Sequence, residues 1–114
     1  MKLFLDSADI EEIKQFYDLG IANGVTTNPS LMKKAAAKYR QDLKSYILNI
    51  CKLAKGTPVS LEVTRRSVDE MVMEGESLYR MFNRYKNVYI KIPINSAFDS
   101  KERLQWDGLR AIRR

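Results

Sequence analysis

The sequence has 114 residues, of which 45% are hydrophobic and 30% charged, and it predicts a single domain, 1–114, large enough to form a core. It contains no histidine, which excludes Ser-His-Asp and Cys-His catalysis and removes the commonest metal ligand. The formal net charge is +6, but basic and acidic residues are mixed along helical stretches and no nucleic-acid-binding motif is present. We therefore expect no nucleic-acid partner.

Neither a membrane span nor a secretory signal is predicted. No stretch approaches the roughly 18 apolar residues that a span needs, and the apolar run after Lys2 ends at Asp6, too early for a signal peptide. We therefore expect a cytoplasmic protein with no membrane partner. Cys51 is the single cysteine, so it forms no internal disulfide, and its apolar neighbours predict a buried structural thiol.

Short apolar runs and amphipathic stretches alternate along the chain. Strands are predicted at 2–6, 24–27, 58–63 and 88–93. Helices are predicted at 9–20, 30–37, 39–54 and 67–82, with a further helix beginning at 108–112. Capping boxes at Asp9 and Ser67 mark two of the helix starts, and Pro29 suits a first helical turn. This fourfold β-α alternation without hairpin signals predicts an α/β fold with a parallel sheet.

Polar residues lie near the carboxyl end of each predicted strand, although buried parallel strands are usually apolar throughout. They are Asp6 on the first strand, Thr26, Thr27 and Asn28 on the second, Ser60 and Glu62 on the third, and Lys91 on the fourth. Alternation puts Asp6, Glu62 and Lys91 on one face of the sheet and the aliphatic side chains on the other. In a barrel the polar face points to the axis, so two carboxylates and one lysine would meet at its mouth.

Each of these residues also has a purely structural interpretation. Asp6 is typical of a helix N-cap, and Asn28 before Pro29 is typical of simple turn chemistry. Glu62 fits an exposed sheet edge, and Lys91 fits a charge that protects such an edge from pairing. Their joint occurrence at equivalent strand positions favours a functional site, because four independent structural causes would rarely produce it together.

One lysine beside two acids suits Schiff-base chemistry. A lysine in a desolvated pocket loses its proton more easily and attacks a ketone carbonyl. Carboxylates then move protons during dehydration and C–C cleavage. Adjacent carboxylates also favour the ammonium form, so the balance between desolvation and charge stays open at the level of the sequence.

Five segments of the chain resemble the transaldolase family. They are FLDSA at 4–8, GVTTNPS at 24–30, VSLEV at 59–63, IKIP at 90–93 and DGLRAI at 107–112. These segments occur in the family's order over nearly the whole chain. The resemblance implies a parallel (β/α)8 TIM-barrel type of α/β fold, of which this sequence holds about the first four βα units.

The resemblance also implies a role for each polar residue. Lys91 forms the imine with the ketose donor, Asp6 accepts the hydroxyl proton when the C–C bond breaks, and Glu62 acts through a water on carbinolamine formation and dehydration. Asn28 and Thr26 hold the dihydroxyacetone hydroxyls. No metal or organic cofactor is implied, because the lysine imine is itself the electron sink.

The implied function is transfer of a dihydroxyacetone unit between sugar phosphates, the transaldolase reaction of the pentose phosphate pathway. One alternative is the fructose-6-phosphate aldolase branch, which releases free dihydroxyacetone and carries glutamine where this chain has Glu62. That difference favours the transferase. A second alternative is a non-catalytic half-barrel that serves assembly.

Two features depart from the family pattern. The segment between Pro93 and Asp107 is longer than in compact members, so we expect an altered loop over the active site. A (β/α)8 barrel needs roughly 200 to 250 residues, so the half that supplies the family's phosphate-binding arginine is expected to be missing. Arg65 and Arg66 offer charge near the third strand, but a solvated helix start is the favoured interpretation. Open edges on the first and fourth strands predict a homo-oligomer with weak or no transferase activity.

Overall fold

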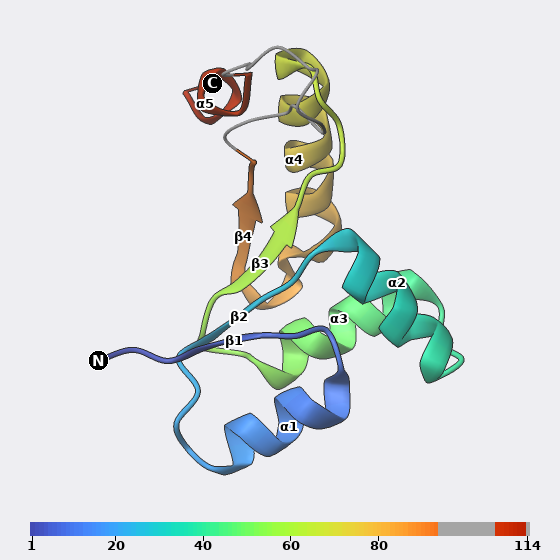
Figure 1. The fold of residues 1–114 in the computed structure, drawn as a ribbon, viewed down its shortest axis with the longest axis vertical. Coiled ribbons are helices and arrows are strands. Elements are labelled where there is room, and N and C mark those ends of the chain that lie inside the picture. The colour runs from blue at the N-terminus through green and yellow to red at the C-terminus, as the bar shows by residue number, and fades with distance from the viewer. Residues whose placement is uncertain (94–106, 114) are drawn as a thin grey trace, which may run out of the picture.

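The computed structural model shows four strands that alternate with helices (Figure 1). It describes residues 1–93 and 107–113. The strands are β1 (Phe4–Asp6), β2 (Gly24–Thr26), β3 (Val59–Glu62) and β4 (Val88–Lys91). The helices are α1 (Ile10–Asp18), α2 (Pro29–Lys38), α3 (Leu43–Leu53), α4 (Val68–Phe82) and α5 (Asp107–Ile112), with a short 3-10 helix at Asn83–Tyr85. The longer segment expected to alter the active-site loop, 94–106, lies outside the described residues.

The four strands form one parallel sheet in the order β1-β2-β3-β4. Each strand pairs with its neighbour in sequence, and a helical connection returns the chain between them, as in the first βα units of a (β/α)8 barrel. The predicted fold class is therefore confirmed. The observed strands are shorter than the predicted runs by one or two residues, because backbone pairing ends before the apolar pattern does.

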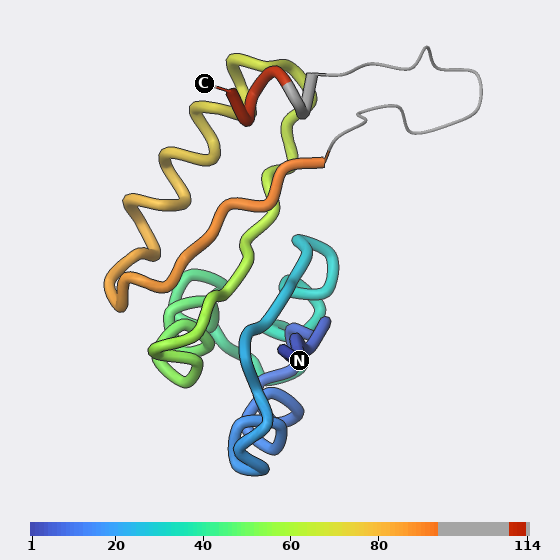
Figure 2. Tube along the Cα trace, turned by 90° about the vertical axis from the view of Figure 1, so that its left-hand side faces the viewer, coloured from blue at the N-terminus to red at the C-terminus, as the bar shows by residue number. Residues whose placement is uncertain are grey.

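The core lies between the aliphatic face of the sheet and the helices, as the alternation predicted. The main cluster includes Val25, Val59, Leu61 and Val88 from the strands and Ile13, Met32, Ala35, Ala36, Tyr46, Ile47, Ile50, Cys51 and Phe82 from helical positions. Ile13 and Ile50 are completely buried, and burial of such a side chain contributes about 1.5–3 kcal/mol. Figure 2 shows α4 on one side of β3 and β4.

A second, smaller cluster lies at the carboxyl end of β4. Its buried members are Val63, Met71 and Ala111, and it joins α4 to α5, which lie beside each other at the top of Figure 1. Partly buried Leu78 and Ile90 pack against both clusters and connect them. In residues 1–93 and 107–113, no helix is long and apolar enough to cross a membrane.

Two helix starts have the side-chain caps that the sequence predicted. The Asp9 carboxylate begins α1 by accepting the backbone N–H groups of Glu11 and Glu12 at 3.0 and 3.3 Å. The Ser67 hydroxyl begins α4 by accepting the N–H of Glu70 at 3.2 Å. Each cap satisfies a backbone donor that has no partner within the helix.

The prediction of one helix over 39–54 is wrong at its start. Tyr39 closes α2 as its C-cap, and Arg40 has a φ of 53°, in the left-handed region that cannot continue a right-handed helix. Asp42 then caps the new helix α3. The apolar periodicity continued across this turn because the Tyr39 ring stacks on Tyr46 of α3, with ring centroids 6.1 Å apart.

Candidate active site

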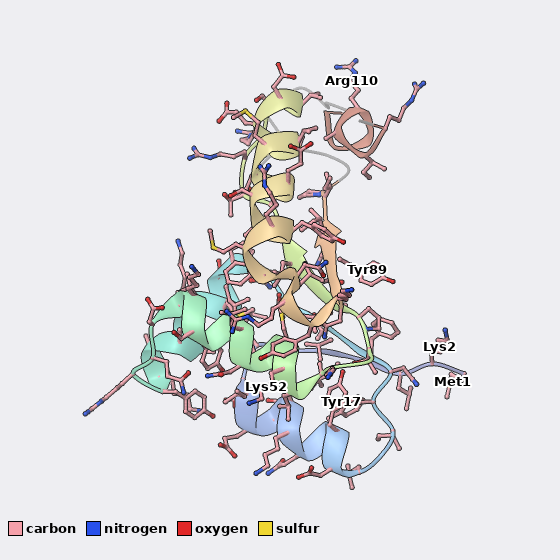
Figure 3. All side chains as sticks on the ribbon, turned by 180° about the vertical axis from the view of Figure 1, so that it is seen from behind. Met1, Lys2, Tyr17, Lys52, Tyr89 and Arg110 are labelled. Carbon is pink, nitrogen blue, oxygen red and sulfur yellow. The ribbon has the colours of Figure 1, made fainter. Side chains whose placement is uncertain are left out.

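The face of the sheet opposite the helical core, called the open face below, carries the polar side chains that the sequence singled out. Strand register aligns Asp6 with Thr26, Thr26 with Ser60, and Ser60 with Tyr89, so these four residues form one row across the sheet. Tyr89 is 63% exposed, and Figure 3 shows it projecting outward from β4. This row contains two predicted site residues, and two, Ser60 and Tyr89, that sequence reasoning did not assign to the site.

Glu62 and Lys91 form the next row toward the carboxyl ends of β3 and β4. They are register partners, and the Lys91 Nζ lies 3.3 Å from the Glu62 Oε2. The interpretation of Glu62 as an edge residue is wrong, because β3 lies between β2 and β4. Lys91 is on the outer strand of the described sheet, and its ammonium is directed to the neighbouring strand. The two side chains are 23% and 45% exposed, so water screens their attraction.

Asp6 is held by the neighbouring strand. The Thr26 hydroxyl donates a hydrogen bond to the Asp6 Oδ1 at 3.0 Å. The interpretation of Asp6 as an N-cap is wrong, because Asp9 performs that role for α1. The bond from Thr26 restricts the rotation of the Asp6 carboxylate and so fixes one of its two oxygens on the open face.

Asn28 is the N-cap of α2, so its structural role is to begin a helix and not to form the simple turn of the alternative interpretation. Its Oδ1 accepts the backbone N–H of Leu31 at 2.9 Å. Among the described residues its Nδ2 amide has no hydrogen-bond partner, so the cap leaves the donor half of the side chain available. Neighbouring Thr27 is buried and donates to the Ser60 carbonyl at 2.7 Å, which ties β2 to β3 below the site.

The base of the open face is closed by an aromatic ring. Phe4 lies one row below Asp6 and pairs with Gly24 in register. A Cβ atom on Gly24 would lie 2.5 Å from the Phe4 ring, so the ring occupies the space that a side chain at position 24 would need. Alternation along β1 puts Phe4 on the same face as Asp6, but the close approach to Gly24 depends on register.

A network of charges beside β1 fixes the start of α1. The Asp9 carboxylate accepts the Lys38 ammonium at 2.8 Å and the Tyr39 hydroxyl at 2.6 Å. The hydrogen bonds from Lys38 and Tyr39, with that from the Glu12 backbone, lower the pKa of Asp9 to about 2. Partial burial of the carboxylate acts in the opposite direction, but its effect is smaller. The α1 start, three residues beyond Asp6, is therefore tied to the end of α2.

The carboxyl-end segment after β3 is held by Glu74 of α4, which sequence reasoning missed. The Glu74 carboxylate accepts hydrogen bonds from the hydroxyl and backbone N–H of Thr64 and from the N–H of Arg65. The Arg65 guanidinium lies 3.9 Å from Glu70 near the start of α4. No signal in the sequence identifies Glu74, because its position on α4 says nothing about which backbone donors it meets.

In the part of the chain that the structure describes, no three carboxylate or cysteine side chains lie close enough together to hold a metal ion. The single thiol, Cys51, is buried in the core, and burial raises its pKa to about 11. Besides the hydroxyls of Thr26, Ser60 and Tyr89, the groups on the open face that offer acid, base and nucleophile functions are the two carboxylates and one lysine of Asp6, Glu62 and Lys91.

Known proteins are similar to this chain along nearly its whole length. The sequence matches the family described as Transaldolase/Fructose-6-phosphate aldolase over residues 3–114. The chain belongs to this family. Within the transaldolase/fructose-6-phosphate aldolase family, the segments that carry Asp6, Asn28, Glu62 and Lys91 all fall inside the matched region.

Curated relatives carry the name probable transaldolase. The protein from Chlorobium phaeobacteroides (strain BS1) is 42% identical over 117 residues, covering 99% of this chain and 46% of the relative. The protein from Carboxydothermus hydrogenoformans is 42% identical over 113 residues, covering 99% and 44%. That from Clostridium perfringens is 46% identical over 94 residues, covering 82% and 40%. The chain thus spans less than half the length of the curated relatives it matches.

Proposed function

We propose that the chain carries the Schiff-base part of a transaldolase-type active site, with Lys91 as the lysine that forms the imine. The observation that carries this proposal is the Lys91 amine 3.3 Å from the Glu62 carboxylate, at the carboxyl ends of neighbouring parallel strands. Membership of the family and the names of the relatives support the same chemistry.

Imine formation uses Lys91 and Glu62. The unprotonated Lys91 amine attacks the C2 carbonyl of a ketose phosphate and gives a carbinolamine. Glu62, acting through a water, delivers a proton to the carbinolamine hydroxyl, which leaves as water while the nitrogen forms the C=N bond. The Glu62 carboxylate must therefore stay close to Lys91 through both steps, as the 3.3 Å separation allows.

Cleavage of the C–C bond uses Asp6. The Asp6 carboxylate takes the proton of the C4 hydroxyl, the C3–C4 bond breaks, and its electron pair moves into the imine to give an enamine. An aldehyde leaves, a second sugar-phosphate aldehyde enters, and Asp6 returns its proton as the new bond forms. The Thr26 hydroxyl, 3.0 Å from Asp6, orients this base. The Asn28 amide and Thr26 hold the hydroxyls of the dihydroxyacetone unit.

Borohydride trapping tests the imine. Reduction in the presence of dihydroxyacetone is expected to add mass to the peptide that contains Lys91. The matched variants are Lys91→Arg, which abolishes the labelling, and Lys52→Arg, an exposed position on α3 that leaves it unchanged. Labelling elsewhere, or none in a folded sample, would show that Lys91 is not the imine lysine.

The transferase is favoured over the aldolase by Glu62 and by the name probable transaldolase that the relatives carry. In a protein that contains this sequence within a complete barrel, transfer of dihydroxyacetone to erythrose 4-phosphate should greatly exceed release of free dihydroxyacetone. Dominant release would instead support the aldolase branch. Sugar phosphates are metabolites of the cell interior, so we propose that this activity belongs to the cytoplasm and to the pentose phosphate pathway. Fractionation of source cells tests the location.

The open edges of the described sheet favour a second candidate, self-assembly. β1 and β4 are the outer strands, and an apolar cavity of about 390 Å³ lies beside β4, lined by Met71, Gly75, Ile90 and Ile92 among others. Unpaired edges beside apolar side chains associate with further strands. We therefore propose that the 114-residue polypeptide forms a homo-oligomer. Light scattering tests this, and a monodisperse, cooperatively folded species of 13.2 kDa would refute it.

A further inference from the structure

Glu74 accepts three hydrogen bonds beside the proposed site, and the proposed reaction uses none of them. Its Oε2 accepts the Thr64 hydroxyl at 2.7 Å, and its Oε1 accepts the backbone N–H groups of Thr64 and of Arg65, the latter at 3.2 Å. Glu74 lies in the second turn of α4, and Figure 1 shows the segment after β3 running up alongside this helix. One side chain therefore holds three donors of a segment that begins two residues after Glu62.

In the described part of the chain, these donors have no partner in the sheet. Within the described residues, the last backbone bond between the β3 and β4 chains runs from the Val63 N–H to the Lys91 carbonyl at 3.1 Å, and the Thr64 and Arg65 N–H groups lie beyond it. Hydrogen bonds to an ionised carboxylate are roughly twice as strong as neutral ones. The backbone that follows Glu62 is thus fixed by β4 on one side and by Glu74 on the other.

We propose that Glu74 is a positioning residue for the Glu62–Lys91 pair. By fixing the direction in which the backbone leaves β3, it holds the Glu62 carboxylate at 3.3 Å from the Lys91 amine. Glu62, Thr64 and Glu74 also border one cavity of about 260 Å³, so the segment has room to move if Glu74 releases it. The catalytic meaning of this role rests on the proposed function, but the positioning itself is measurable without substrate.

Three variants separate positioning from general stability. Glu74→Ala removes all three acceptor contacts while placing the best helix-forming residue on α4. Glu74→Gln keeps the shape and one acceptor oxygen. Glu76→Ala is the matched control, because Glu76 is exposed on the same helix and has no hydrogen-bond partner among the described residues.

The first measurement is borohydride trapping at Lys91 over a range of dihydroxyacetone concentrations. Glu74→Ala is expected to lower the maximal trapping rate about tenfold or more, with the half-saturating concentration within about twofold of wild type. Glu74→Gln should recover most of the rate, and Glu76→Ala should match wild type. Equal losses in Glu74→Ala and Glu76→Ala, or a wild-type rate in a folded Glu74→Ala protein, would overturn the proposal.

The second measurement needs no substrate and separates this proposal from the proposed function. The rate at which acetic anhydride labels the Lys91 amine is compared with the rate at Lys52. Glu62→Gln should raise the Lys91 rate because it removes the carboxylate partner, and Glu74→Ala should raise it in the same direction by about twofold or more. Amide exchange at Thr64 and Arg65 should rise about tenfold in Glu74→Ala.

These readouts decide between the possible failures. If wild-type protein gives no imine at Lys91 but Glu74→Ala still changes the Lys91 labelling rate, the proposed function fails and the positioning role stands. An unchanged Lys91 rate in folded Glu74→Ala protein contradicts the positioning role whatever the trapping shows. If Glu74→Ala does not fold, Thr64→Val replaces it, with a smaller change expected in the same direction because it removes one of the three contacts of Glu74, and a wild-type Lys91 rate in folded Thr64→Val protein overturns the proposal.

Discussion

Replacement of Asp9 by Asn separates the charge of the α1 cap from the two hydrogen bonds that begin the helix. Asn is as good an N-cap as Asp, so Asp9→Asn keeps the bonds to the first turn of α1. It removes the negative charge that accepts the Lys38 ammonium at 2.8 Å and the Tyr39 hydroxyl at 2.6 Å. The Tyr39 hydroxyl bonds the Oδ1 that the amide keeps, whereas Lys38 bonds Oδ2, so any loss of stability measures the negative charge together with the Lys38 hydrogen bond.

The size of that loss follows from the pKa of Asp9. The carboxyl pKa falls from its usual 3.8 to about 2, mainly through the hydrogen bond from Lys38 and then that from Tyr39. This difference in pKa corresponds to about 2.5 kcal/mol of stability, at about 1.36 kcal/mol per pKa unit. Because the Lys38 side chain is 64% exposed, water screens the pair, and we expect about 1–2 kcal/mol in the free energy of unfolding.

The pH dependence gives the sharper test. A lowered pKa in the folded state stabilises the protein above the unfolded pKa, and the contribution disappears as the pH falls through the folded pKa. The difference between wild type and Asp9→Asn should therefore be complete above about pH 5 and shrink between pH 4 and pH 2. Urea unfolding at a series of pH values measures it. A difference that stays constant from pH 7 to pH 3 would refute the electrostatic explanation.

Three further predictions concern the core and the base of the open face. Tyr46→Phe should lower the free energy of unfolding by about 1–3 kcal/mol, because the buried Tyr46 hydroxyl donates to the Ala8 carbonyl at 2.6 Å. Urea unfolding measures this loss, and a value below about 0.5 kcal/mol would contradict the prediction. Cys51 should not react with Ellman's reagent at pH 8 in the folded protein, since the thiol is buried and its pKa is raised to about 11, whereas full reaction before unfolding would argue against its burial. Gly24→Ala should destabilise the fold by about 1 kcal/mol through the clash with Phe4, and thermal melts should show that Phe4→Ala relieves part of it; an undiminished effect would exclude the clash.

The part of the site that the sequence predicted depended on local alternation. A strand has a period of two, so the apolar positions alone determine which face Glu62 and Lys91 occupy. Both residues then lie at carboxyl ends, and the order of the parallel strands brings them together. The same reasoning placed Asp6 on this face. These inferences needed only residue type and position within a strand.

The rest depends on contacts between residues far apart in the sequence. The bond from Thr26 to Asp6 joins positions 20 residues apart, and it follows from register that no pattern within either strand reveals. The break between α2 and α3 depends on the left-handed φ of Arg40, a residue type with no special tendency to stop a helix. The role of Glu74 depends on how α4 lies against the segment after β3.

The division of the core into two clusters also affects how the molecule opens. Among the residues that the structure describes, the buried members of the smaller cluster are Val63, Met71 and Ala111, so within that part of the chain its local unfolding exposes far less apolar surface than loss of the main core. Segments with few buried apolar contacts open more often than the whole fold. The carboxyl ends of β3 and β4 border this smaller cluster. The end of the sheet that carries Lys91 should therefore exchange its amide hydrogens through brief partial opening, while β1 and β2 remain folded.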